Sequence, residues 1–172
     1  GSHDTASAVM AVPESTGESV YISSGTWSLM GIESKKAIIN DEARTANFTN
    51  EGGYEHRFRF LKNIMGLWMI QSIRHEYNDA YSFAQLCELA QENKDFSSRV
   101  DVNDDMTQAV QDYCKETGQR VPETIGELAE VVYQSLAICY KKAIDNLEDI
   151  AGKTYNSIHI IGGGSNATYL NQ

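Results

Sequence analysis

The sequence predicts an α/β fold, in which short strands come first, helices follow, and one more strand returns near the end. Three observations carry this prediction. Short apolar segments separated by turn residues occupy the chain from residue 20 to about residue 49. An apolar stripe at helical spacing runs over 125–150, and an isoleucine-rich segment at 158–161 ends in three glycines. We expect a three-stranded antiparallel meander and one parallel strand, flanked by helices.

The meander is predicted from three short segments. Residues 20–22 and 27–31 form the first two strands, and the sequence Ser-Ser-Gly-Thr at 23–26 predicts a hairpin turn between them. Alternate residues of the second strand share one face: Trp27, Leu29 and Gly31. The segment 44–49 is the third strand candidate, with Phe48 as its clearest apolar contact.

Four segments before the main helix predict shorter helices. Asp4 is placed to cap the first, which is followed by small residues. Residues 60–77 predict a second helix, with apolar residues on nearly every side of its first half, so we expect its Trp and Met residues to lie in the core. Residues 82–91 and 106–117 predict the third and fourth.

The clearest helix spans about 124–151. Thr124 and Glu127 have the spacing of a capping box, in which each side chain bonds the other residue's backbone N–H. Gly152 stands where a glycine often ends a helix.

The glycines 162–164 follow the strand predicted at 158–161. Ser165 or Asn166 then offers an N-cap for a helical turn at 167–170. Glycines let a backbone approach a ligand closely, and the free N–H groups of a helix start favour an anion. The alternative is a tight turn with no ligand, because the pattern matches neither the dinucleotide fingerprint nor the P-loop.

Composition limits the classes of function. The chain has 172 residues, enough for one domain or slightly more, and a net charge of −10, which argues against nucleic acid and anionic membranes as partners. No apolar run approaches the roughly 20 residues that span a bilayer, and no signal peptide is evident. Three widely spaced cysteines, Cys87, Cys114 and Cys139, indicate reduced thiols and a cytoplasmic protein.

Four stretches carry a resemblance to a known family. They read H-D-T-A-S-A at 3–8, S-G-T-W-S at 24–28, R-F-L-K-N-I-M-G-L-W at 59–68 and G-G-G-S at 162–165. Together they resemble the C-terminal half of the FGGY carbohydrate kinases, and the similarity runs over nearly the whole chain. The resemblance implies a ribonuclease-H-like domain of the actin and hexokinase type, where two such domains close on ATP and a sugar.

We therefore expect residues 1–172 to be the nucleotide-binding C-terminal portion of a two-domain enzyme. The chain stops at Gln172, less than two turns into the last expected helix. The missing N-terminal domain would supply most of the sugar contacts, so this portion alone should have no kinase activity.

The resemblance places His3, Asp4 and Thr5 beside the sugar. It makes Asp4 the general base, which takes the proton of the sugar hydroxyl as this hydroxyl attacks the γ-phosphoryl group. The alternative is that Asp4 only caps a helix, and Gly1, Ser2 and His3 also match the remnant of a cleaved tag. Asn63 would contact the sugar too, although the pattern alone makes it a helix-surface residue.

The resemblance assigns the nucleotide to three residues. Thr26 would donate to phosphate oxygens, Gln71 would contact the nucleotide, and the backbone of Gly163 would lie against it. The alternatives are an ordinary hairpin turn at Thr26 and a helix-surface role for Gln71. ATP would bring Mg²⁺, held mainly by phosphates and water. No protein metal site is predicted, because the histidines do not cluster: His56, His75 and His159.

The resemblance implies ATP-dependent phosphorylation of L-rhamnulose to L-rhamnulose 1-phosphate. One alternative is an FGGY kinase for another sugar. A second, from a different class, is a non-catalytic actin-like nucleotide-binding module. Sugar-dependent ADP release separates a kinase from such a module.

Overall fold

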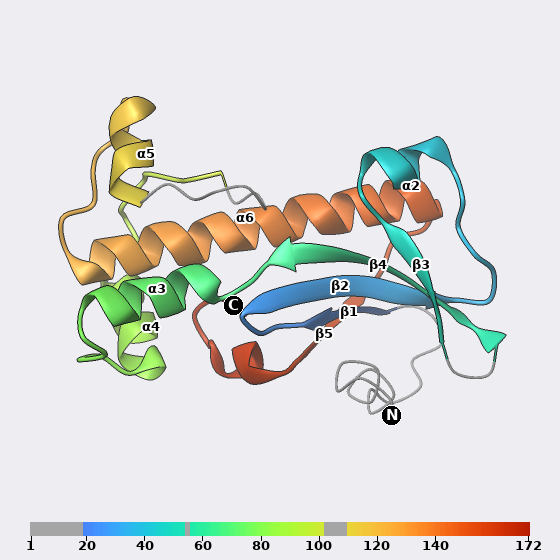
Figure 1. Ribbon diagram of the computed structural model, residues 1–172, viewed down its shortest axis with the longest axis horizontal. Helices are drawn as coiled ribbons and strands as arrows, with labels where there is room; N and C mark the ends of the chain where they lie inside the picture. Colours follow the sequence, from blue (N-terminus) through green and yellow to red (C-terminus); the bar gives the residue numbers. More distant parts are fainter. Residues whose placement is uncertain (1–18, 54–55, 102–109) are drawn as a thin grey trace.

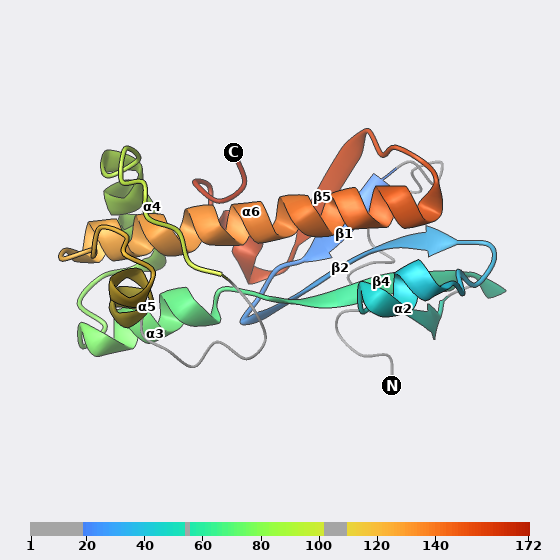
Figure 2. The ribbon, with the colours of Figure 1, turned by 90° about the horizontal axis from the view of Figure 1, so that it is seen from above.

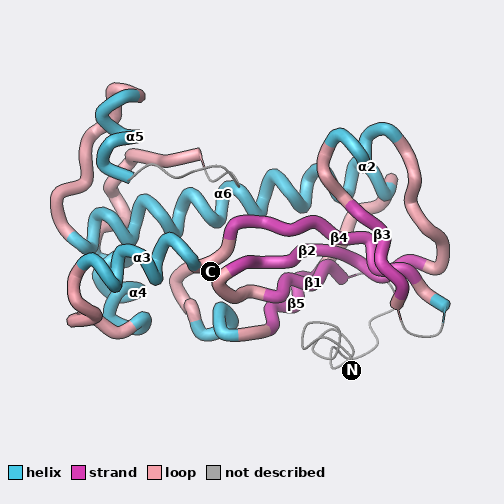
Figure 3. Tube along the Cα trace, in the orientation of Figure 1, coloured by secondary structure: helices cyan, strands magenta, loops and turns pink. Residues whose placement is uncertain are grey.

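A five-stranded mixed sheet forms the centre of the molecule (Figure 3). The computed structural model describes residues 19–53, 56–101 and 110–172. The sheet has the order β3-β4-β2-β1-β5. Its strands are β1 (Ser19–Ser23), β2 (Trp27–Ser34), β3 (Thr49–Gly52), β4 (Phe58–Met65) and β5 (Ser157–Ile161). The strands β1, β2, β4 and β3 pair antiparallel, and β5 pairs parallel with β1. The predicted α/β fold, its first hairpin and its parallel last strand are therefore confirmed, but β2 has β4 and not the next strand in sequence as its second neighbour.

The third strand of the meander is not the predicted segment 44–49. A short helix, α2 (Asp41–Thr45), ends within that segment, and its N-cap Asn40 accepts a hydrogen bond from the backbone N–H of Ala43 at 2.7 Å. Phe48 is buried as expected, and its ring stacks on that of Phe60 with 4.9 Å between centroids. The edge strand β3 reads Thr-Asn-Glu-Gly and therefore carries no apolar alternation that would reveal it.

The predicted helix at 60–77 is wrong in its first half. Residues up to Met65 form β4, which lies between β3 and β2, and the helix α3 (Trp68–Glu76) begins after Gly66. Phe60 and Leu61 are consecutive and both buried, and Ile64 is buried four residues after Phe60, a spacing that also fits one face of a helix, so periodicity does not separate the two structures here. Trp68, expected in the core, is 39% exposed.

The remaining helices lie close to their predicted positions. α4 (Phe83–Glu92) starts with a capping box between Ser82 and Gln85. α5 (Val110–Glu116) confirms the described part of the segment predicted at 106–117. The helix predicted after Asp4 falls outside the described residues.

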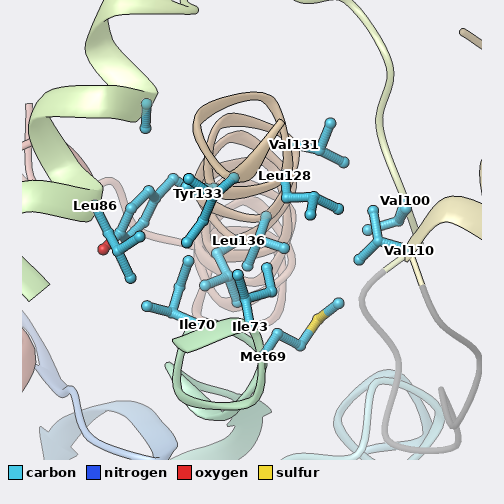
Figure 4. Packing of buried hydrophobic residues seen from close by; sticks show 14 of the residues in the cluster. Met69, Ile70, Ile73, Leu86, Val100, Val110, Leu128, Val131, Tyr133 and Leu136 are labelled. Atoms are coloured by element: carbon cyan, nitrogen blue, oxygen red, sulfur yellow. The ribbon is translucent and has the colours of Figure 1, made fainter. Parts of the chain in front are cut away.

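The long helix α6 (Ile125–Ala151) joins the two halves of the core (Figures 1 and 2). It has the predicted capping box of Thr124 and Glu127, and Gly152 ends it with a left-handed φ of 64°. Its first half packs on α3 and α4, and Figure 4 shows side chains from these helices meeting. They include Ile70, Ile73, Leu86, Leu128 and Leu136. Its second half covers one face of the sheet through Tyr140, Ala143 and Leu147.

Glu130 is a fully buried carboxylate in the first half of α6. The Nη2 of Arg99 lies 3.8 Å from Oε1 of Glu130. Burial raises the pKa of Glu130 above its ordinary value, and the hydroxyl of Tyr169 and the charge of Arg99 oppose this shift only in part. The folded protein therefore holds the Glu130 proton at pH values where the unfolded chain has released it.

Glu130→Gln is expected to raise the thermal midpoint at pH 8, with a gain that shrinks as the pH falls toward 4.5. An acid whose pKa is raised on folding loses stability as the pH rises above its unfolded pKa, because unfolding then releases the proton. The amide keeps the shape and has no proton to lose. Thermal melts of both proteins across this pH range test the prediction. A lower midpoint for Glu130→Gln at pH 8 would instead indicate a net favourable ion pair with Arg99.

Candidate functional site

The glycine turn after β5 is tied to the end of β1. The backbone N–H of Ser24 donates to the carbonyl of Ile161 at 2.8 Å, and that of Gly164 donates to the carbonyl of Ser24 at 2.9 Å. Gly162 has a left-handed φ of +88°, and a Cβ there would lie 2.6 Å from the Ser24 carbonyl oxygen. The turn therefore requires glycine at 162 for both its backbone and its space.

The segment after the turn differs from the prediction. A 3₁₀ helix, η2 (Gly163–Asn166), follows directly with Gly162 at its N-cap, and residues 167–170 form no helix. Neither Ser165 nor Asn166 caps a helix. The Ser165 hydroxyl instead donates back to the carbonyl of Gly162 at 2.7 Å, which stabilises the tight turn.

Gly163 and Gly164 differ in the space that the fold leaves for a side chain. A Cβ built on Gly164 would overlap the side chain of Ser24 and would lie 3.2 Å from Cδ1 of Leu67. A Cβ built on Gly163 would meet no atom within 4 Å, and its φ is not left-handed. The fold therefore fills the space at Gly164, while no described residue fills the space beside Gly163.

The β1–β2 turn is braced against the start of α3. Leu67 N–H donates to the carbonyl of Gly25 at 2.8 Å, and Trp68 N–H donates to that of Thr26 at 3.2 Å. A Cβ on Gly66 would lie 2.6 Å from the Thr26 carbonyl oxygen, so only glycine permits this approach. The hairpin turn, the start of α3 and the glycine turn thus lie together at one end of the sheet.

Two of the predicted nucleotide residues contact each other. The Nε2 of Gln71 donates to the Thr26 hydroxyl at 3.1 Å. The Thr26 hydroxyl in turn lies 3.3 Å from Oε1 of Gln71 and donates to it. Thr26 is exposed and Gln71 is half-buried, so a ligand phosphate could reach this hydroxyl and replace Gln71 as its acceptor. Gly163 lies in the adjoining glycine turn, and the structure therefore brings all three predicted nucleotide residues to the same end of the sheet.

The three segments are electrically neutral, although the chain as a whole is strongly acidic. None of the residues 24–26, 66–71 and 162–166 is charged, while the net charge of the chain is −10. Beneath them, the hydroxyls of Ser28 and Tyr140 lie 2.7 Å apart. Burial raises the pKa of Tyr140, which keeps its phenol neutral. The three segments themselves therefore present dipoles and hydroxyls and no carboxylate.

The predicted sugar residues are only partly described. His3, Asp4 and Thr5 lie outside the described residues. Asn63 is exposed, but it lies on β4 and not on a helix, with Leu29 of β2 as its cross-strand partner. The sequence prediction placed Asn63 on a helix because it missed β4.

Sequence reasoning also missed the residues that hold the turns together. Ser24, Gly66 and Gly164 contribute close backbone approach and no distinctive chemistry. The available signal was a glycine directly after an apolar run, which often marks a close approach of two backbones.

No group of three or more His, Cys, Asp or Glu residues in the described ranges is placed to share a metal ion. No helix that the structure describes is both long enough and apolar enough to cross a membrane.

A family model for the C-terminal domain of the FGGY carbohydrate kinases matches residues 20–172. The chain belongs to the FGGY family of carbohydrate kinases. The resemblance seen in the sequence is confirmed, and the five-stranded sheet with its helices is the FGGY C-terminal domain.

Relatives and solved structures agree with this assignment. The chain is 51% identical over 177 residues to a rhamnulokinase of Halalkalibacterium halodurans, covering 99% of this chain and 38% of the relative. It is 48% identical to a rhamnulokinase of Oceanobacillus iheyensis, covering 99% of this chain and 37% of the relative. The crystal structure of a xylulose kinase from Rhodospirillum rubrum superposes with a TM-score of 0.75 at 13% identity, covering 99% of this chain and 35% of that one. This FGGY chain thus spans less than two fifths of each.

Proposed function

We propose that residues 1–172 form the nucleotide-binding C-terminal portion of a two-domain kinase that phosphorylates L-rhamnulose at O1 with ATP. The relatives at 51% and 48% identity are both rhamnulokinases, which favours this sugar. The rest of the longer protein would supply further sugar contacts. Free cysteines and an ATP-dependent reaction favour the cytoplasm.

The observation that carries the proposal is the meeting of Thr26, Gln71 and Gly163 at one end of the sheet. They come from three distant segments, and two of them share a hydrogen bond. The Thr26 hydroxyl can donate to a phosphate oxygen, and the open side of Gly163 leaves room for a nucleotide. The segments 24–26, 66–71 and 162–166 carry no carboxylate of their own, which lowers the repulsion that a polyanionic substrate would meet on an acidic chain.

The remaining predicted residues would act on the sugar. Asp4 would take the proton from O1 as O1 forms its bond to the γ-phosphorus, and the bond from phosphorus to the bridging oxygen of ADP breaks. His3, Thr5 and Asn63 would position the sugar for this in-line attack. Mg²⁺, when bound with the nucleotide, would supply positive charge that neutralises the phosphate oxygens.

Sugar-dependent ADP release by the full-length protein tests the proposal. We expect ADP release with L-rhamnulose far above the rate without sugar, and above the rate with D-xylulose. A higher rate with D-xylulose would assign another sugar to this FGGY kinase. No increase with any ketose tested would favour the non-catalytic nucleotide-binding module.

A further inference from the structure

The residues of β2 alternate between two different environments. Ser28, Met30 and Ile32 face α6, and the Ser28 hydroxyl reaches Tyr140 on that helix. Trp27 and Leu29 therefore lie on the opposite face, which α6 does not cover. This confirms the predicted grouping of Trp27 with Leu29 on one face.

Trp27 is exposed on this second face, next to the residues of the proposed site. Its surface is 57% exposed, which is large for a tryptophan, a residue that is highly buried on average. It directly follows Thr26, the proposed phosphate contact. Across the sheet, Trp27 pairs with Met65 and Leu29 pairs with Asn63, so Trp27 and Asn63 are diagonal neighbours on one face.

The spacing along β2 matches the two proposed substrate contacts. Asn63 lies opposite Leu29, three residues from Thr26, which is roughly 10 Å at the rise of an antiparallel strand. A monosaccharide that contacts Asn63 while it attacks a phosphoryl group at Thr26 would lie along the surface between these two residues. Trp27 lies on that surface, between Thr26 and Leu29.

We propose that the indole ring of Trp27 forms the apolar wall of the sugar subsite and packs against the C–H face of the acceptor sugar. This inference rests on the proposed kinase function. The face of an aromatic ring is electron-rich and attracts the weakly positive hydrogens of C–H groups. Burying an apolar surface of this size also gains free energy from water release, which polar side chains such as Asn63 cannot provide.

Calorimetric binding of L-rhamnulose and steady-state kinetics of the full-length protein test whether Trp27 contacts the sugar. Trp27→Ala is expected to weaken L-rhamnulose binding by at least ~10-fold and to raise its KM, since a factor of ten corresponds to about 1.4 kcal/mol. The KM for ATP should change by less than a factor of about 2. Trp27→Phe keeps a ring and should retain most of the sugar affinity.

Phe83→Ala is the matched control, because Phe83 is another exposed aromatic residue, 44% exposed, on α4. It should leave both KM values unchanged. If Trp27→Ala binds L-rhamnulose with unchanged affinity, the proposed sugar contact of Trp27 is wrong. The proposal is also wrong if only the KM for ATP rises, because Trp27 would then stack on the nucleotide base. A large loss of thermal midpoint with normal sugar binding would also overturn it, in favour of packing against another part of the protein. A wild-type protein that neither binds nor phosphorylates L-rhamnulose would overturn the proposed function and the wall together.

Discussion

Asp4→Asn in the full-length protein is expected to lower kcat by ~10²–10⁴-fold while changing the affinity for L-rhamnulose little. Loss of a general base typically costs this much, because the attacking hydroxyl must then keep its proton in the transition state. The amide keeps the size of the carboxylate and much of its hydrogen bonding, so sugar binding should persist. Steady-state kinetics combined with calorimetric sugar binding separate the two effects.

The matched control is Asp41→Asn, at an exposed carboxylate in the first turn of α2. This variant removes the same charge from the surface and should leave kcat unchanged. If Asp4→Asn also keeps the wild-type kcat, Asp4 is not the base, and the simpler assignment of a helix cap would stand. A variant that loses sugar binding and kcat together would give Asp4 a binding role and no separate part in proton transfer.

The sequence predicted best those elements whose signals are local. The ends of α6 follow from Thr124, Glu127 and Gly152, because each satisfies or terminates the backbone bonds of its own helix. The strand β5 was equally clear, since isoleucines bounded by glycines have few alternative structures. The family motifs then supplied the architecture into which these elements fit.

The errors arose where the tertiary environment decides the structure. In β4, Phe60 packs against α6 and its neighbour Leu61 is buried on the opposite face of the sheet, so two consecutive residues are buried side by side. No sequence window contains that information. The edge strand β3 was missed for the opposite reason: its residues are polar, and a solvent-facing strand needs no apolar alternation that a sequence pattern could reveal.

In the candidate site, too, the sequence predicted the local turn but not the tertiary contacts. The motif at 162–164 indicated a glycine turn, but the sequence could not tell which glycine the fold needs. That difference depends on Ser24, which fills the space beside Gly164 and leaves Gly163 open. The contact of Thr26 with Gln71 likewise exists only because Gly66 lets the hairpin turn approach α3.

Gly163→Val and Gly164→Val make a matched pair that separates nucleotide binding from folding. The branched side chain at 163 enters open space, and the backbone there does not require glycine, so the thermal midpoint of the full-length protein should change by less than about 2 °C. If a nucleotide lies against Gly163, ATP affinity should fall by at least ~10-fold, which is about 1.4 kcal/mol. The same side chain at 164 must displace Ser24, and overpacking of this kind should lower the midpoint by at least ~4 °C.

Measuring ATP affinity and thermal midpoint on both variants gives each result one meaning. Weakened ATP binding with an unchanged midpoint in Gly163→Val supports the nucleotide contact, because nothing in the described fold occupies that space. Normal ATP binding by a stable Gly163→Val protein would contradict it, and Thr26 and Gln71 would then be the proposed nucleotide residues that remain. Gly164→Val shows whether loss of the turn alone weakens ATP binding. If its folded fraction binds ATP normally while Gly163→Val does not, then the open side of Gly163, and not the integrity of the turn, determines nucleotide affinity.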